Sequence, residues 1–158
     1  MKEQEICRHN EKEIVGFFGE YRWLSNMWPC EIPLWGKIYP SVENAYVAGK
    51  VPTEEVGYME KTRSLIQNMK PSEAKRFGRK MRVREDWEET KVTLMRNLIR
   101  FKFVCNPELQ ANLLATGNKH LEEANWWGDT FWGTYNGRGQ NWLGRILMEV
   151  RESLKHNS

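Results

Sequence analysis

The chain has 158 residues, of which 40% are hydrophobic and 28% are charged, and its formal net charge is +3. This length suits one domain with a sizeable core, and no run approaches the roughly 18 apolar residues of a membrane span. The polar N-terminus does not resemble a signal peptide, and three widely separated cysteines argue against disulfides or a cysteine-rich metal site. We therefore expect a cytoplasmic protein with no metal and no cofactor.

Tryptophan is the outlier in the composition, with eight residues in the chain. Its large flat ring suits packing in a core, and it equally suits stacking on a base or a sugar. Only some of the eight are therefore expected to be core residues.

The first predicted elements are short strands followed by a well-marked helix start. Residues 13–18, EIVGFF, favour a strand, and residues 30–39, CEIPLWGKIY, favour two strands that turn near Trp35 and Gly36. Ser41 is then placed to cap a helix.

Helices dominate the rest of the chain. The expected helices are 54–66 capped by Thr53, 73–80 capped by Ser72, about 87–105 starting at Asp86 with Glu89, Asn106-Pro107 to Gly117, and about 141–155. The apolar positions of the long helix keep a helical period, namely Trp87, Leu94, Leu98, Phe101 and Cys105. In the last helix the residues expected to face inward are Leu143, Ile146, Leu147, Val150 and Leu154. An extended piece is expected near KHLEEAN, residues 119–125. The predicted fold class is mainly α with a small antiparallel β-sheet (α+β), in a single domain over 1–158 with 1–12 as a flexible extension.

The helix after Ser41 carries Glu43, Tyr46 and Lys50. Seven residues separate Glu43 from Lys50, so the two share a helical face but lie about 10 Å apart along the axis. They are too far apart for the usual ion pair at a spacing of three or four. Two interpretations stay open: a first-turn glutamate favoured by the helix dipole with a solvated lysine, or a site that holds a ligand between them.

Residues 125–146, NWWGDTFWGTYNGRGQNWLGRI, contain five glycines and four tryptophans. The glycines permit tight turns and close approach of the backbone to a ligand, and GRGQN leads into a helix whose free N–H groups could hold an anion. The stretch lacks the ending of a phosphate loop and the βαβ setting of a dinucleotide site. A structured loop with tryptophans in the core is the alternative.

Two further stretches carry polar groups. Ser25 and Asn26 are compact hydrogen-bonding residues among aromatic rings, and turn capping explains them equally well. Residues 75–84 hold six cations, namely Lys75, Arg76, Arg79, Lys80, Arg82 and Arg84. Such a run is usually a solvated helix face, and contact with phosphates is the alternative.

Four motifs in series, FFGEYRWLSNM, YPSVENAYVAGK, DTFWG and GQNWLGRILMEVR, closely resemble the NADAR, or YbiA-like, family. The resemblance runs from about Phe17 to Arg151. It implies a mainly helical fold and an N-glycosidase. Some members act on riboflavin-biosynthesis intermediates, and others remove ADP-ribose from modified guanine in nucleic acids. The implied partners are therefore a ribose-phosphate or ADP-ribose-containing substrate, or ADP-ribosylated nucleic acid, and no membrane.

The resemblance also implies site residues. The family's catalytic glutamate matches Glu43, its downstream lysine matches Lys50, and its aspartate matches Asp129. The implied substrate-binding residues are Phe18, Ser25, Asn26, Asn44, Trp87, Trp132, Gly133 and Asn141. One departure is that Asn44 stands where many members have histidine, so a titratable neighbour of the glutamate is lost, although an amide can still bind a sugar hydroxyl.

The implied chemistry accounts for the Glu43–Lys50 face. Breaking an N-glycosidic bond builds positive charge on the anomeric carbon, which a carboxylate stabilises while it activates water. An amine could instead attack the sugar carbon. We expect Trp132 and Asp129 to form one wall of the pocket, facing Glu43, with Asn141 both capping the last helix and reaching the ligand. The alternatives are a non-catalytic ADP-ribose or nucleotide-binding module and a nucleic-acid-binding protein that uses the basic run.

Overall fold

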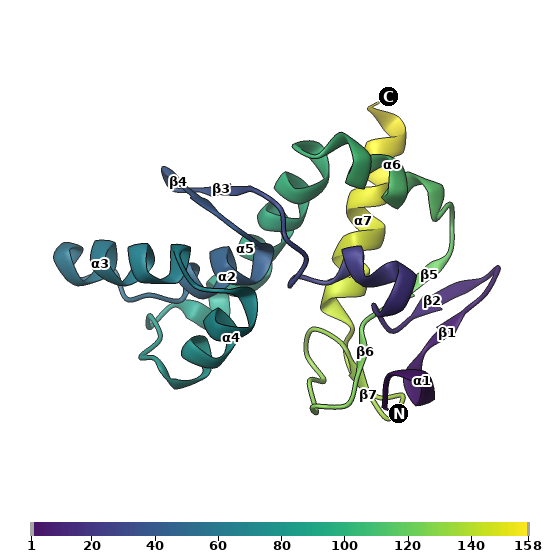
Figure 1. Cartoon of the computed structure of the whole chain (residues 1–158), viewed down its shortest axis with the longest axis horizontal. Helices are drawn as coiled ribbons and strands as arrows, with labels where there is room; N and C mark the ends of the chain where they lie inside the picture. The colour runs from purple at the N-terminus through teal and green to yellow at the C-terminus, as the bar shows by residue number, and fades with distance from the viewer. Residues whose placement is uncertain (1, 158) are drawn as a thin grey trace. The chain divides into compact units, whose positions relative to one another are not determined.

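A computed structural model describes residues 2–157, with side chains from Glu3 to Asn157. The chain forms two compact units (Figure 1). One unit joins the segment that ends at Ser25 to the segment that begins at Pro107, and the other is Asn26–Asn106. None of the helices in residues 2–157 combines the length and apolar character that a membrane crossing requires.

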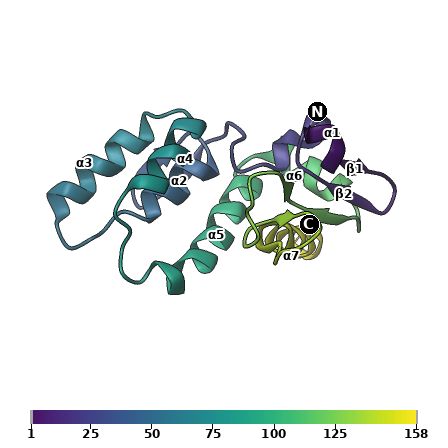
Figure 2. The same cartoon turned by 90° about the horizontal axis from the view of Figure 1, so that it is seen from below.

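The unit Asn26–Asn106 is built around the short helix α2. Its elements are the strands β3 (Ile32–Leu34) and β4 (Lys37–Tyr39) and the helices α2 (Val42–Gly49), α3 (Val56–Gln67), α4 (Pro71–Lys80) and α5 (Trp87–Val104). The helix α2 packs against α3, α4 and α5 (Figure 2), and seven of its eight residues are buried. Side chains that α2 carries are thereby held by neighbours on several sides.

The hairpin β3–β4 confirms the predicted strand pair. Its strands are antiparallel, with Leu34 opposite Lys37. Trp35 and Gly36 both have positive φ, 46° and 82°, as the two central residues of a tight hairpin turn of the I′ type require.

The other unit combines small sheets with helices. Its strands are β1 (Arg8–His9), β2 (Glu13–Val15), β5 (His120–Glu122), β6 (Ala124–Asn125) and β7 (Thr134–Tyr135), and its helices are α1 (Lys2–Ile6), the 3-10 helix η1 (Gly19–Leu24), α6 (Pro107–Ala115) and α7 (Trp142–His156). The strand order is β1-β2-β5 in one sheet and β6-β7 in another. The last helix, α7, packs against β5 and α6.

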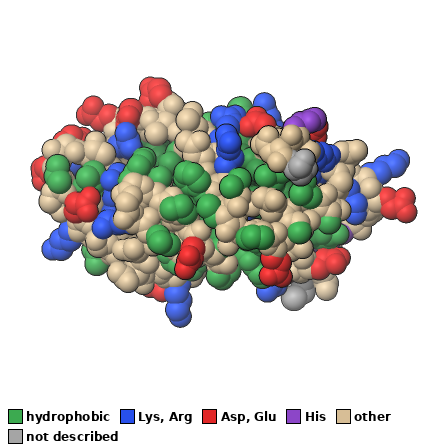
Figure 3. Space-filling view, turned by 90° about the horizontal axis from the view of Figure 1, so that it is seen from above, with side chains coloured by type: hydrophobic (Ala, Val, Ile, Leu, Met, Phe, Trp, Pro, Cys, Tyr) green, Lys and Arg blue, Asp and Glu red, His purple; other side chains and the backbone are tan. Residues whose placement is uncertain are grey.

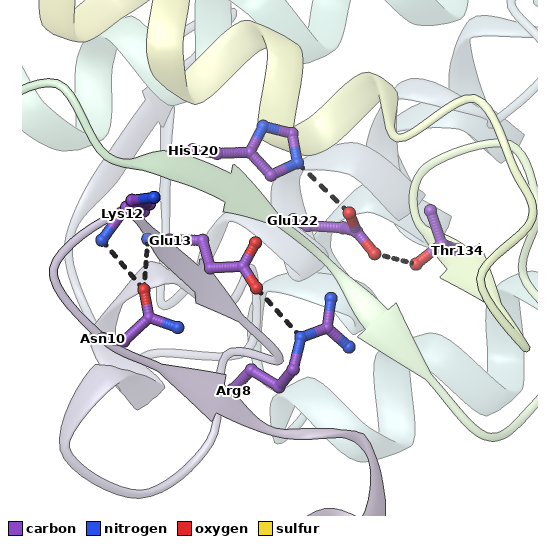
Figure 4. A network of polar contacts seen from close by, with 7 residues as sticks. All are labelled: Arg8, Asn10, Lys12, Glu13, His120, Glu122 and Thr134. Atoms are coloured by element: carbon purple, nitrogen blue, oxygen red, sulfur yellow. Dashed lines mark hydrogen bonds and ion pairs between the residues drawn. The ribbon is translucent and has the colours of Figure 1, made fainter.

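Side-chain contacts link the strands of this unit (Figure 4). Arg8 Nε lies 2.9 Å from Glu13 Oε1, which joins β1 to β2. In β5, Glu122 accepts a hydrogen bond of 2.8 Å from Thr134 Oγ1 and lies 3.1 Å from His120 Nε2. The contact between Glu122 and Thr134 links β5 to β7, which lies within the glycine-rich stretch.

The mainly helical α+β prediction is confirmed, with two differences in detail. Within residues 2–157, three small sheets form instead of one, and the pairs β2–β5 and β6–β7 are parallel. Residues 2–9 form α1 and β1, and β1 pairs with β2.

The predicted helices occur, but three of their caps were wrong. α3 begins at Val56 with Glu55 at its N-cap, and α4 begins at Pro71 with Lys70 there, so neither Thr53 nor Ser72 caps a helix. Asp86 does precede α5, but its carboxylate binds the Arg84 guanidinium at 2.6 and 3.0 Å and makes no capping bond. A charged partner nearby competes successfully with backbone N–H groups for a carboxylate.

The apolar positions that keep the helical period of α5 are not all buried. Trp87, Leu94 and Leu98 are buried, whereas Phe101 is 37% exposed and Cys105 is exposed. The buried face of α5 is wider than the predicted row of residues. It also includes Met95, Ile99, Lys102 and Phe103. The five apolar positions predicted for the last helix are all buried.

Candidate active site

The start of α2 is fixed by Ser41, which confirms the predicted cap. Ser41 Oγ accepts a hydrogen bond of 3.1 Å from the Asn44 N–H and donates one of 2.5 Å to Asn44 Oδ1. Glu43 lies in the first turn and is half-buried, and its N–H donates to the Asn26 carbonyl at 3.0 Å. Because the N-terminal end of a helix favours negative charge, this position stabilises the ionised form of Glu43.

Asn44 does not have the ligand-facing position predicted for it. The residue is fully buried, and its Nδ2 donates to the carbonyls of Ile66 and Met69, both at 2.9 Å. Its Oδ1 is bound by Ser41. With both ends of the amide engaged, Asn44 joins the start of α2 to the end of α3 and has no group left for a sugar hydroxyl.

Lys50 follows α2 directly and is half-buried against aromatic rings. Its Nζ lies over the ring of Tyr46, 5.2 Å from the centroid, and the Tyr46 ring lies 5.1 Å from that of Trp87. Burial lowers the pKa of Lys50 below 10.5, and the charges of Lys91 and Arg79 lower it further, while Glu43 acts in the opposite direction. A lower pKa leaves more of the amine neutral, which is the nucleophilic form.

Asn26 lies beside Glu43 with an unusual hydrogen-bonding pattern. Its side chain is 8% exposed, its Nδ2 lies 3.6 Å from Met95 Sδ, and its Oδ1 is buried with no partner among the described residues. Ser25, the preceding residue, is half-buried, and its N–H donates to the Arg22 carbonyl. A buried unsatisfied acceptor is costly, so the Asn26 amide is suited to a further donor.

In the other unit, Asp129 organises the glycine-rich loop. Its Oδ1 accepts hydrogen bonds from the N–H groups of Phe131 at 3.0 Å and Trp132 at 2.9 Å, and its own N–H donates to Asn125 Oδ1. Asp129 is thus a turn former, and its second carboxylate oxygen keeps its capacity to accept from a ligand. Trp132 is half-buried and meets Phe131 edge to face at 4.8 Å.

Gly133 and Asn141 are explained by local packing. A Cβ on Gly133 would clash with the Glu123 carbonyl oxygen, so only glycine fits. Asn141 is 7% exposed; its Nδ2 donates to the Leu121 carbonyl, and its Oδ1 accepts from the Glu123 N–H, both at 3.0 Å. It stands at the N-cap position of α7 with φ of 52° but makes no capping bond, so the predicted side-chain cap was wrong.

Phe18 lies in an aromatic cluster. Its ring stacks on Trp126 at 5.2 Å with an angle of 21° between the planes, and it meets Trp127 edge-on at 6.4 Å. It also lines a cavity of about 370 Å³ together with Cys7 and His9.

The predicted residues divide between the two units. Asn26, Glu43, Asn44, Lys50 and Trp87 belong to Asn26–Asn106, and Phe18, Ser25, Asp129, Trp132, Gly133 and Asn141 belong to the other unit. The expectation that Glu43, Asp129 and Trp132 line one pocket stays a prediction.

Sequence reasoning missed two cations whose charges act on Lys50. It treated Arg79 only as part of the basic run and did not single out Lys91, yet both influence the pKa of Lys50. It also missed a groove of about 740 Å³ between the β3–β4 hairpin and α5, which none of the predicted site residues lines.

A family model, described as the NADAR domain, matches residues 11–155. The chain belongs to the NADAR family. The N-glycosidase YbiA of Escherichia coli (strain K12) is 34% identical to this NADAR protein over 165 residues, which cover 98% of the chain and 96% of YbiA. The riboflavin biosynthesis protein VVA0006 of Vibrio vulnificus is 37% identical over 159 residues, covering 99% of the chain but only 40% of that longer relative. The NMR structure of E. coli YbiA superposes with a TM-score of 0.78 at 32% identity, covering 99% of the chain and 92% of YbiA.

Proposed function

We propose that this NADAR protein is an N-glycosidase, a hydrolase that separates a base from a phosphorylated ribose or an ADP-ribose unit. The observation that carries the proposal is the α2 face. It presents a half-buried carboxylate, Glu43, in the first turn and a half-buried amine, Lys50, just past the last. Relatives of nearly the same length are named N-glycosidases, which supports the same reaction here.

The proposed hydrolysis uses Glu43 as the charged group at the reaction centre. As the bond between base and ribose breaks, the bonding electrons leave with the base and positive charge builds on the anomeric carbon. The Glu43 carboxylate stabilises that charge and accepts a proton from the attacking water. The water oxygen becomes the new hydroxyl of the sugar, and the proton balances the charge on the departing base.

Lys50 offers a second route to the same products. The neutral amine attacks the anomeric carbon, displaces the base and gives an imine of the ring-opened sugar, which water then hydrolyses to regenerate the amine. The lowered pKa of Lys50 supports this role, because burial and the neighbouring cations increase the neutral fraction.

We assign supporting roles to three further residues. Trp132 provides a ring on which a base or ribose stacks, and Asp129 accepts hydrogen bonds from sugar hydroxyls through the oxygen that the turn does not use. Asn26 contributes its unpartnered Oδ1 as an acceptor.

Two substrate classes fit this reaction: riboflavin-biosynthesis intermediates and ADP-ribosylated guanine in nucleic acid. The relative in Vibrio vulnificus is named a riboflavin biosynthesis protein, which supports the first class. The deciding experiment is incubation with each substrate, followed by mass spectrometry of the released base and sugar. Release of free base from either substrate supports the N-glycosidase. Binding of both without any product would instead indicate a non-catalytic ADP-ribose or nucleotide-binding module.

A further inference from the structure

A groove of about 740 Å³ lies between the β3–β4 hairpin and α5, within the unit Asn26–Asn106. This volume falls in the range of small-molecule sites, which is roughly 300–1,000 Å³. Thr93 and Asn97 line the groove from α5, and each is two residues from Met95, which is about 200° around a helix. Met95 contacts the Asn26 amide. The groove therefore opens on the side of α5 away from Asn26, and no residue that we assign to the reaction lines it.

The hairpin wall of the groove holds an aromatic ring in a fixed place. Trp35 lines the groove and is 52% exposed, and the Arg63 guanidinium lies over its ring, 4.5 Å from the centroid. Arg63 is itself buried, and its Nε donates to the Ala48 carbonyl at 3.3 Å. The arginine thus anchors the ring from one side, and the exposed part of the ring offers a surface for stacking.

The backbone of Trp35 indicates that the ring serves more than the turn. Its φ of 46° lies in the left-handed region, which a bulky side chain rarely adopts. The first central position of a type I′ turn is usually Asn, Asp or Gly. Residues held in such conformations cluster at functional sites, so a ligand explains this exposed tryptophan better than the turn does.

The remaining apolar lining comes from both walls. Ile38 of the hairpin and Phe101 of α5 are exposed and line the groove, together with the buried residues Leu34 and Leu94. On the face shown in Figure 3, hydrophobic side chains are exposed among acidic and basic ones. Apolar walls on two sides suit a flat aromatic ligand that fills the space between them.

The α5 wall also carries polar side chains. Glu89, Thr93 and Asn97 follow one another at intervals of four residues and so form a row along the helix. All three are exposed and line the groove, and their side chains form no hydrogen bond or ion pair within residues 3–157. Their donors and acceptors are therefore free to bind polar groups of a ligand.

The charges at the groove favour a cation. Two of its lining residues are charged, namely Lys37 on the hairpin and Glu89 on α5. Lys37 Nζ lies 3.4 Å from Glu60 Oε2, which offsets its charge, whereas Glu89 has no cationic partner within residues 3–157. A ligand with one positive charge complements Glu89.

We infer that the groove binds a small aromatic amine, with the ring against Trp35 and the protonated amine at Glu89. The ring gains apolar contact between the hairpin and α5, and the ammonium donates a charge-assisted hydrogen bond to the carboxylate. Thr93 and Asn97 bind further polar groups of the ligand and so select among amines. This site is separate from the proposed N-glycosidase reaction and does not depend on it.

The test is calorimetric titration of the full chain with tryptamine, with indole-3-propionate as the probe that has the same ring and the opposite charge. Tryptamine should bind at least about 10-fold more tightly, the value of a charged hydrogen bond. Glu89→Gln should remove this difference. Glu85→Gln is the matched control, since Glu85 is an exposed glutamate four residues earlier that does not line the groove, and it should bind both probes as the wild type does.

Trp35→Asn tests the ring without disturbing the turn. Asparagine tolerates the positive φ, so the variant should unfold at the temperature of the wild type or above it. It should bind tryptamine at least about 10-fold more weakly, because the stacking surface is lost. Glu43→Gln should bind tryptamine as the wild type does, because Glu43 does not line the groove.

Four results would overturn the site. Neither probe would bind, indole-3-propionate would bind as tightly as tryptamine, Trp35→Asn would bind tryptamine as tightly as the wild type, or Glu43→Gln would weaken tryptamine binding as much as Glu89→Gln does. The last result would place tryptamine at the α2 face instead of the groove.

Discussion

The ammonium of Lys50 lies over the ring of Tyr46, 5.2 Å from its centroid, and that ring lies 5.1 Å from the ring of Trp87. The lysine is thereby held on a buried aromatic surface. This contact favours the ammonium form, whereas burial favours the neutral amine, and the pKa of Lys50 is lowered on balance. The balance makes the protonation state of Lys50 sensitive to its charged neighbours.

A first prediction concerns the pH dependence of turnover. If neutral Lys50 attacks the sugar, kcat/KM should rise with pH until the lowered pKa of Lys50 is passed and then level off. Arg79→Gln and Lys91→Gln each remove a positive charge that lowers this pKa, so the rise should move to higher pH in both. Arg76→Gln is the control and should leave the pH dependence of kcat/KM unchanged. Glu43→Asp cannot serve as one, because it moves the carboxylate that raises the pKa of Lys50. A rise that stays at the same pH in the two variants would exclude Lys50 as the titrating group.

The same pKa predicts how Lys50 affects stability. Its folded pKa lies below its unfolded value of about 10.4, so the unfolded chain binds more protons between the two values. The contribution of Lys50 to the free energy of unfolding should therefore rise with pH in that window. In Lys50→Met this dependence should be absent, which urea unfolding at several pH values would reveal.

The second prediction is that Glu43→Gln lowers base release by at least about 100-fold, because the shape is kept and only the charge and basicity are lost. The free energy of unfolding should change by no more than about 1 kcal/mol, the usual value of a first-turn charge. Glu85→Gln is a matched control, since Glu85 is an exposed glutamate of the same unit. Activity that survives in Glu43→Gln, with an unchanged circular dichroism spectrum, would remove Glu43 from catalysis.

The third prediction separates the two roles open to Lys50. A lysine that attacks the sugar forms an imine, so borohydride added during turnover should leave a reduced sugar adduct on Lys50, detectable by peptide mass spectrometry. Lys50→Arg should form no adduct and should lose nearly all activity. If no adduct is trapped and the activity of Lys50→Arg falls only a few-fold, Lys50 positions the substrate and Glu43 activates the attacking water.

Features of this site that depend on a few consecutive residues were predictable from the sequence. Features that depend on how distant segments pack together were not. Ser41 followed by a helix is a signal within a few residues, and the structure confirms it, whereas Asp86 failed as a cap because Arg84 competes for its carboxylate. The effect of the charges of Arg79 and Lys91 on the pKa of Lys50 depends on how α4 and α5 pack on α2. The sequence pattern of a single helix does not predict which other helix it packs against. The sequence alone therefore could not show that Arg79, among the cations of the basic run, affects the pKa of Lys50.

The fourth prediction follows from the position of Asn44. Asn44→Ala should destabilise the protein by about 2–4 kcal/mol, because the carbonyls of Ile66 and Met69 lose their donor in a buried place. Asn44→His should lose less stability than Asn44→Ala, since a ring N–H can donate to one of these carbonyls. Thermal unfolding measures both. A destabilisation of Asn44→Ala below about 0.5 kcal/mol, the range of ordinary surface substitutions, would contradict the joining role.

The last prediction tests whether Asp129 acts through its charge or only as a turn former. The turn uses Oδ1 of Asp129, which accepts from the N–H groups of Phe131 and Trp132. Asp129→Asn keeps that oxygen and removes the charge, so the loop should stay folded and the tryptophan fluorescence of the protein should be unchanged. If the carboxylate binds sugar hydroxyls or stabilises positive charge on the ribose, kcat/KM should fall by about 10- to 100-fold, the value of one charged hydrogen bond. Asp129→Ala removes the turn as well and should therefore lose both activity and loop order. An Asp129→Asn protein with wild-type kinetics would assign Asp129 to the turn alone, and the charge at the sugar would then rest on Glu43.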